Sequence, residues 1–335
     1  MLLSALELFF SLGLILFAAE VFTNGVEWLG LRLRLAEGAV GSILAAVGTA
    51  LPESLIPLIA FLLGKGVEQQ HIGIGAIIGA PFMLSTLAFF ISGLVVSVDA
   101  GKRPDFPNLR IDPRVIRRDL GFFFGGYSLG IGAAFIPDLA AKKVVAGGLL
   151  LWYSLYVFLT LRGGSAGQPS SLRPLFFGVS KKKPGLVLIL SQIAFALAVL
   201  IGGAQLFIRS VSEIARMLGV PSFFLSLIIA PIATELPEKF NSIIWLKQQK
   251  DTLALGNITG AMTFQSTILP ALGIIFTDWH FVAGSWAPIL LTFASAGLVL
   301  ISLSNGKKLT SYTLLMGGLF YLIFLGTTLC SKGWF

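Results

Sequence analysis

Two short segments decide how this chain folds: Gly48-Thr49-Ala50-Leu51-Pro52-Glu53-Ser54 and Ala233-Thr234-Glu235-Leu236-Pro237-Glu238-Lys239. Each lies in a long apolar run, where an ionised side chain costs about 2.5 to 3.5 kcal/mol by insertion scales and needs a partner. Each proline lacks an amide hydrogen, so the carbonyl four residues earlier loses its hydrogen bond. We therefore expect a broken helix at Pro52 and at Pro237, with the freed backbone facing protein or a water-filled cavity.

Oxygen-bearing side chains share one face of each predicted helix. Thr49 and Glu53 lie four residues apart, as do Thr234 and Glu238. Glu235 and Glu238 lie three apart, a spacing that also brings side chains onto one helix face. Because carboxylate, hydroxyl and carbonyl oxygens are the ligands that hard cations prefer, the two segments predict an all-oxygen cation site.

The composition is that of a polytopic membrane protein. Of the 335 residues, 56% are hydrophobic and 12% are charged, and the mean hydropathy is +0.89, which ordinary soluble domains do not reach. The first apolar run has no basic residues before it and predicts a retained span. The single cysteine, Cys330, excludes an internal disulfide framework. The net charge is +8, and the basic residues lie in loops between the spans, without interleaved aromatic residues. Membrane orientation therefore explains these basic residues better than nucleic-acid binding does.

At about 20 apolar residues per crossing, the chain has ten predicted spans. They cover approximately residues 2–29, 38–63, 71–98, 119–137, 142–161, 185–209, 221–246, 252–276, 283–303 and 310–330. Of the 24 lysines and arginines, 17 lie in the connections that follow odd-numbered spans, 6 lie on the other side, and Lys239 is within a span. The positive-inside rule then places both termini outside the cytoplasm, and we expect a multi-pass protein of the cell (inner) membrane.

The two halves of the chain are related by an internal repeat. A shift of 185 residues lays Thr49–Glu53 onto Thr234–Glu238. Downstream, a shift of 181 lays Gly75–Ala80 onto Gly256–Ala261, and it also brings Ser-Thr pairs into register, at 85–86 and 266–267.

Each half would hold five spans, and an odd number makes the two copies insert in opposite orientations. The two acidic segments would then enter the bilayer from opposite faces and meet near its middle, as in alternating-access carriers. The sequence thus predicts an all-α fold of ten transmembrane helices in two inverted five-helix repeats, residues 1–161 and 185–335, joined by a cytoplasmic linker at 162–184.

At these residues the sequence resembles the sodium/calcium exchanger family, within the cation/calcium antiporter superfamily, over essentially the whole chain. The family's repeat reads like G-T-S-L-P-E, followed about two dozen residues later by G-N-x-x-G-S-N-x-x-N/D. Residues 48–53 keep the first part well and residues 233–238 recognisably. The resemblance implies cation exchange, with Glu53, Glu238, Thr49 and Thr234 as ion ligands.

The second part of the family pattern departs here. The family's serine falls on Ala80 and Ala261, its next asparagine on Pro81 and Met262, and its final Asn or Asp on Leu84 and Gln265. Glu235 stands where the family usually has serine, and Lys239 directly follows Glu238. Several oxygen ligands are therefore missing and one carboxylate is added, so the ion preference stays open.

Three uses of the acidic residues are compatible with the sequence. Glu53, Glu235 and Glu238 could neutralise a divalent ion with one charge to spare. Crowding of like charges could instead keep one carboxyl protonated as a proton carrier. In the third arrangement, the Lys239 ammonium replaces a bound monovalent cation, and Glu235 could also simply neutralise that lysine.

Structural roles compete with ligand roles for the other polar and small residues. The hydroxyls of Thr49 and Thr234 could serve merely to donate hydrogen bonds to carbonyls of their own helices. The Gln265 amide could form a hydrogen bond with another helix and not bind an ion. The glycine pairs Gly75/Gly79 and Gly256/Gly260 have the small-xxx-small spacing that lets helices approach closely. We interpret both pairs as packing contacts.

The working hypothesis is a sodium-driven calcium exchanger that is not an enzyme and uses no cofactor beyond the transported Ca²⁺ and Na⁺. Its partners are small inorganic cations and the lipid bilayer, not nucleic acid, and its oligomeric state stays open. Glu53 and Glu238 are the expected central ligands and Glu235 an auxiliary one, with Thr49, Thr234 and Gln265 around them. The first and sixth spans are the expected gates. The alternatives are a proton-coupled cation exchanger and a non-transporting membrane protein that retains the exchanger fold.

Overall fold

Helices make up almost all of the part of the chain described by the computed structural model, which is residues 2–32, 45–64, 66–162, 174–178, 184–304 and 308–330. The helices are α1 (Leu2–Arg32), α3 (Ala45–Leu62), α4 (Val67–Met83), the π-helical η2 (Leu84–Ala88), α5 (Phe89–Val98), α6 (Pro113–Gly132), α7 (Leu139–Arg162), α8 (Leu186–Leu218), α9 (Ser222–Lys247), α10 (Asp251–Gln265), α11 (Ile268–Phe276), α12 (Trp286–Ser304) and α13 (Ser311–Cys330). Short 3₁₀ turns lie at Ala100–Lys102, Ala133–Phe135, Phe176–Gly178 and Ala283–Ser285. The all-α prediction is confirmed.

Each predicted span overlaps one of these helices or a run of two or three consecutive ones. By length and composition, seven helical stretches of the described chain can cross a membrane: α1, α4 to α5, α7, α8, α10 to α11, α12 and α13. The chain is thus a membrane protein, and the number of ten crossings stays a prediction. The helix predicted to start at residue 119 starts instead at Pro113, because the Asp112 side chain accepts from the Arg114 amide and proline is favoured at the first helical position.

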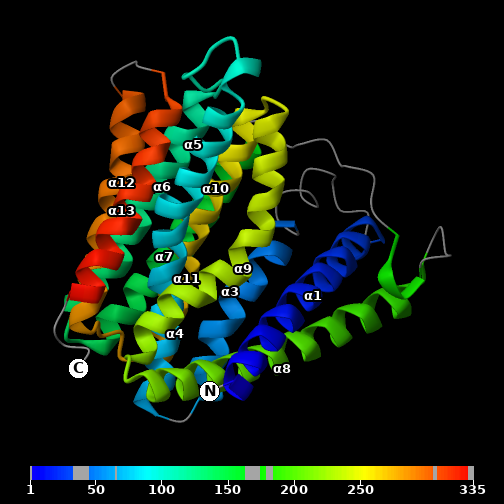
Figure 1. Cartoon of the computed structure of the whole chain (residues 1–335). Coiled ribbons are helices and arrows are strands. Elements are labelled where there is room, and N and C mark those ends of the chain that lie inside the picture. Colours follow the sequence, from blue (N-terminus) through cyan, green and yellow to red (C-terminus); the bar gives the residue numbers. More distant parts are fainter. Residues whose placement is uncertain are drawn as a thin grey trace.

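The predicted helix breaks at Pro52 and Pro237 are wrong. α3 and α9 each continue as a helix through their proline. A proline removes one backbone hydrogen bond, and a packed helix accommodates that loss by bending rather than ending. Figure 1 shows this in α9, whose ribbon changes direction part-way along its length.

The interruptions lie in two other places, which the 181-residue shift relates to each other. α4 passes into the π-helical turn η2 at Leu84, and α10 ends at Gln265 before α11 starts at Ile268. Hydroxyl groups at both places compete for a helix carbonyl. The Ser85 and Thr86 hydroxyls donate to Phe82 O at 3.2 and 2.5 Å.

The second interruption has the same hydrogen-bond pattern. The Ser266 and Thr267 hydroxyls donate to Thr263 O at 2.9 and 2.7 Å, and Thr263 is the residue that a shift of 181 lays on Phe82. The two interruptions differ in backbone conformation, but they share the same Ser-Thr hydrogen bonds at matching positions.

Helices from the two halves pack in pairs. α1 runs antiparallel to α8, since Ser4 Oγ donates to Glu213 at 3.1 Å while Gln192 Nε2 donates to Val21 O at 2.9 Å. α4 and α9 run side by side in the same direction, with Ser226 Oγ donating to Ile72 O at 2.7 Å. These directions agree with helices that cross alternately in chain order.

The two glycine pairs differ in what they contact. A Cβ atom added at Gly75 or Gly79 would overlap the backbone carbonyl of Phe223 or Leu227, so α4 and α9 touch backbone to backbone. A Cβ at Gly256 would be 3.7 Å from Val115 and one at Gly260 3.3 Å from the Tyr156 hydroxyl, both of them side-chain atoms. The prediction of close helix approach is confirmed for the first pair only.

We expect Gly79→Ala to destabilise the protein by about 1 to 3 kcal/mol, the usual cost of overpacking. The added methyl group would meet the Leu227 carbonyl oxygen, which cannot move without shifting α9. Thermal unfolding of detergent-purified protein measures the effect. Gly256→Ala is the matched control because its Cβ has room, and equal melting temperatures for the two variants would contradict the contact.

The buried apolar side chains form two clusters. The larger one is built mainly from α4 to α7 and α9 to α13, and the smaller one joins α1, α3 and α8 to parts of α4 and α9. Figure 1 shows α1 and α8 side by side at the edge of the molecule, tilted away from the main bundle. These two helices therefore pack closely against each other and, through the smaller cluster, also against α3 and parts of α4 and α9.

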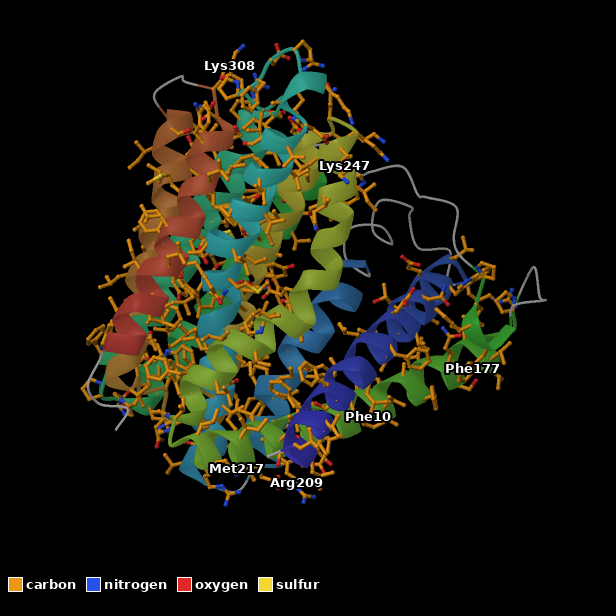
Figure 2. The ribbon with its side chains drawn as sticks, viewed as in Figure 1. Phe10, Phe177, Arg209, Met217, Lys247 and Lys308 are labelled. Carbon is orange, nitrogen blue, oxygen red and sulfur yellow. The ribbon has the colours of Figure 1, made fainter. Side chains whose placement is uncertain are left out.

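Three of the predicted cytoplasmic connections meet at one end of the bundle. Arg103, in the connection before α6, is buried against Asp251 at the start of α10, with nitrogen–oxygen distances of 2.9 and 3.0 Å. The amide of Leu109 donates to Leu309 O at 2.9 Å, which joins the same connection to the one before α13. Figure 2 shows Lys247 and Lys308 at this end, and Arg209 and Met217 at the opposite end.

Candidate cation site

The Gln265 side chain bridges two buried glutamates. Its Nε2 donates to Glu53 Oε2 and to Glu235 Oε1, both at 2.8 Å. Glu53 is 6% exposed, and Glu235 and Gln265 are fully buried at 0%. A single amide nitrogen therefore holds two carboxyl groups, one from each acidic segment of the sequence.

Three helices bring these side chains together. Glu53 lies on α3, Glu235 on α9, and Gln265 is the last residue of α10, directly before the interruption at Ser266. The carbonyl end of a helix carries a partial negative charge. The carboxylates and the end of α10 thus make a region of negative potential, which suits a cation.

The amide oxygen of Gln265 is buried and makes no hydrogen bond within the part of the chain that the structure describes. Both hydrogens of the Nε2 group have carboxylate acceptors. A buried carbonyl oxygen without a donor is a ready ligand for a hard cation, as are carboxylate oxygens.

For the other predicted ligands the structure gives fewer contacts. Thr234 is buried, and its hydroxyl donates to Ala230 O at 3.1 Å, which is the back-bonding role considered above. The oxygen lone pairs of that hydroxyl stay available. The side chains of Thr49, Glu238 and Lys239 lie outside the described residues, so their ligand roles stay predictions.

Apolar side chains stand at the positions where the family's polar residues are missing, and most of them are buried. Ala80, Leu84 and Met262 are each at most 3% exposed. Gln265, at the position of the family's final Asn or Asp, is thus the oxygen-bearing side chain from the second part of the pattern that contacts the glutamates. Among the described residues no group of three or more His, Cys, Asp or Glu side chains has the geometry of a metal site.

One buried acid was not predicted as a functional residue. Asp119 is the first residue of the predicted span 119–137, and it lies within α6 at 1% exposure. Its carboxylate accepts from Thr259 at 2.8 Å, from Arg118 at 3.0 Å and from Tyr156 at 3.1 Å, and its carbonyl accepts from Thr263 at 3.0 Å. Since both threonines lie on α10, Asp119 fixes the helix that carries Gln265.

Comparison with known proteins identifies the family. The sequence profile described as "Sodium/calcium exchanger protein" matches residues 3–162 and 188–331. The chain belongs to this family. The chain is 23% identical over 320 residues to an Alkalimonas amylolytica protein named as the antiporter CaxA, covering 92% of each chain. It is also 37% identical, over 65 residues and 19% of each chain, to the sodium/calcium exchanger MaX1 of Methanosarcina acetivorans.

Solved structures show the same fold. The chain superposes on a crystal structure of the H⁺/Ca²⁺ exchanger CAX with a TM-score of 0.77, at 16% identity, covering 98% of this chain and 82% of that one. A structure of the sodium-calcium exchanger NCX_Mj gives a TM-score of 0.58 at 20% identity, covering 97% and 98%. The chain thus has the fold of these two proteins, one of which is named as an H⁺/Ca²⁺ exchanger and the other as a sodium-calcium exchanger.

Proposed function

We propose that this protein is a secondary active antiporter that moves Ca²⁺ against Na⁺ across a membrane by alternating access, with Glu53, Glu235 and Gln265 at the centre of its ion site. The observation that carries the proposal is the Gln265 amide, which holds one carboxyl group from each acidic segment at 2.8 Å. Glu238, Thr49 and Thr234 are proposed as further ligands on the resemblance to the family.

Exchange follows from the charge of this site. Two ionised carboxylates are neutralised by one divalent ion or by two monovalent ions, but their oxygens cannot serve both at once. Leaving the pair without any cation in the protein interior is costly. One ion is therefore released only as the other takes its place, which is the requirement for antiport.

The architecture supports alternating access. The family profile matches one segment in each proposed half, and the paired Ser-Thr interruptions support two repeats with five helices each, residues 1–161 and 185–335. α1 and α8, which lie at the edge of the bundle and contribute most of the smaller apolar cluster, are the proposed gates that rock against the remaining helices. The cytoplasmic linker at 162–184 and the external termini are part of the same proposal.

A proton is the second candidate for the driving ion, and a specific observation favours it. Ala80, Leu84 and Met262 are buried where the family pattern has oxygen-bearing side chains. Sodium requires a cage of several oxygens, whereas a proton needs only one carboxylate. As the counter-ion, a proton therefore demands less of the reduced oxygen set than sodium does.

Uptake of ⁴⁵Ca²⁺ into vesicles with the reconstituted protein tests the function. We expect uptake when a sodium gradient is imposed at equal pH on both sides, and its loss when the gradient is collapsed. Uptake driven by a pH gradient in sodium-free buffer would establish the proton as the driving ion instead. Protein-free vesicles give the background, and no uptake under either gradient would mean a membrane protein that keeps the fold without transport.

A further inference from the structure

A cavity of about 320 Å³ opens at the end of the bundle where the basic connections meet. Its wall contains Arg110 and Asp105 from the connection before α6, Arg117 from α6, and Lys308 from the connection before α13. Leu109 and Leu303 are among its apolar lining residues. The cavity lies apart from the buried glutamates and has no part in the proposed transport chemistry.

Backbone hydrogen bonds fix the shape of this cavity. Leu109 N donates to Leu309 O at 2.9 Å, and Ser311 N donates to Pro107 O at 2.8 Å. On the other side, Arg110 N donates to the buried carboxylate of Asp251 at 2.8 Å. Because the site is already formed before the ligand binds, binding loses less free energy to ordering of the protein.

The charge of the cavity suits an anion. Three cationic side chains and one acidic one line it, which gives a net charge of +2. Arg110 pairs with Asp105, and Arg117 donates to Leu303 O, but a guanidinium has five N–H donors and can bind further acceptors. Lys308 is exposed. Arginine and lysine together with backbone donors are the usual partners of phosphate groups.

The face of α13 places the cavity near the membrane surface. Tyr312, Met316, Leu319 and Ile323 recur at helical spacing, and each is between 41% and 57% exposed. Such an apolar stripe on a membrane helix faces lipid. Tyr312 begins the stripe at the cavity end and packs edge-on against Phe106, with ring centroids 5.9 Å apart, and tyrosine is enriched at the level of the lipid headgroups.

We propose that this cavity binds the phosphate headgroup of an anionic phospholipid. The basic side chains bind the phosphate, and the apolar wall contacts the first carbons of the glycerol and acyl chains. Tyr312 lies at the level of the headgroups. Basic pockets beside membrane helices on the cytoplasmic side are suited to such headgroups.

Native mass spectrometry of the detergent-purified full chain, titrated with short-chain phosphatidylglycerol, tests the proposal. We expect binding to the wild type and about fivefold weaker binding to Lys308→Gln, the effect of one basic residue near a membrane surface. Asp105→Asn should bind more tightly, because it raises the net charge and releases Arg110. Lys247→Gln is the matched control, since Lys247 is exposed at the same end but does not line the cavity.

Phosphatidylcholine and inorganic phosphate are the comparison ligands. Weak or undetectable binding of both supports a site for anionic lipid. Equal affinity of Lys308→Gln and Lys247→Gln for phosphatidylglycerol would overturn the proposal. So would inorganic phosphate that displaces phosphatidylglycerol at equal concentration, which would indicate a site for a soluble anion.

Discussion

Replacing Glu53 or Glu235 with glutamine is expected to reduce gradient-driven Ca²⁺ uptake by about 100-fold or more. Each substitution keeps the size of the side chain and removes one of the two negative charges that face Gln265. Removing one member of a buried charged set costs about 3 to 5 kcal/mol, and each 1.4 kcal/mol is a factor of ten. Initial rates of ⁴⁵Ca²⁺ uptake into vesicles give the measurement.

Calorimetry on the same variants distinguishes an effect on Ca²⁺ binding from an effect on Ca²⁺ transport. Both substitutions should also weaken Ca²⁺ binding to the purified protein, because the lost charge belongs to the site itself. Glu68→Gln, in the first turn of α4, is the matched control and should retain uptake. Undiminished uptake in Glu53→Gln or Glu235→Gln would remove that residue from the ion site.

Gln265→Leu is expected to lower the free energy of unfolding by about 3 kcal/mol or more when no divalent ion is present. The substitution deletes two hydrogen bonds to charged groups, each worth about 1.5 to 3 kcal/mol, and leaves both carboxyl groups without that donor in the protein interior. Addition of Ca²⁺ should restore much of the loss, since the ion takes over the neutralising role. Thermal unfolding with and without Ca²⁺ measures both effects.

Asn257→Leu is the matched control for this second prediction. Asn257 lies on the same helix and donates one hydrogen bond, to Ser242 Oγ at 3.0 Å, so its loss should cost about 1 kcal/mol. Ca²⁺ should not rescue that variant. A Gln265→Leu protein that is no less stable than Asn257→Leu, or that Ca²⁺ fails to stabilise, would contradict the bridging role of the amide.

Much of the fold could be predicted because long apolar runs in a membrane protein have few structures open to them. The helix positions, the all-α class and the close helix packing at Gly75 and Gly79 follow from residue type and spacing, although the partner helix α9 does not. Helix ends depend on local capping, which is why α6 starts at Pro113 and not with its apolar run. Whether a proline ends a helix depends on its packing neighbours, and the sequence does not contain those.

The candidate site could be predicted in part. The register of the second repeat placed Gln265 at a ligand position. The doubled motif predicted Glu53 and Glu238 as the central ligands, with Glu235 as an auxiliary one. The sequence did not indicate that one amide joins the two glutamates, because that contact requires α3, α9 and α10 to meet. Asp119 was missed because an acid beside Arg117 and Arg118 has the pattern of a solvated helix end, and only tertiary packing buries it.

The backbone contact between α4 and α9 has a consequence for how the protein is made. Leu227 follows Gly79 by 148 residues, so the glycine face of α4 leaves the ribosome well before its partner exists. The newly inserted amino-terminal half must therefore wait in the bilayer with that face against lipid or an assembly factor. Folding of the core is completed only when α9 arrives.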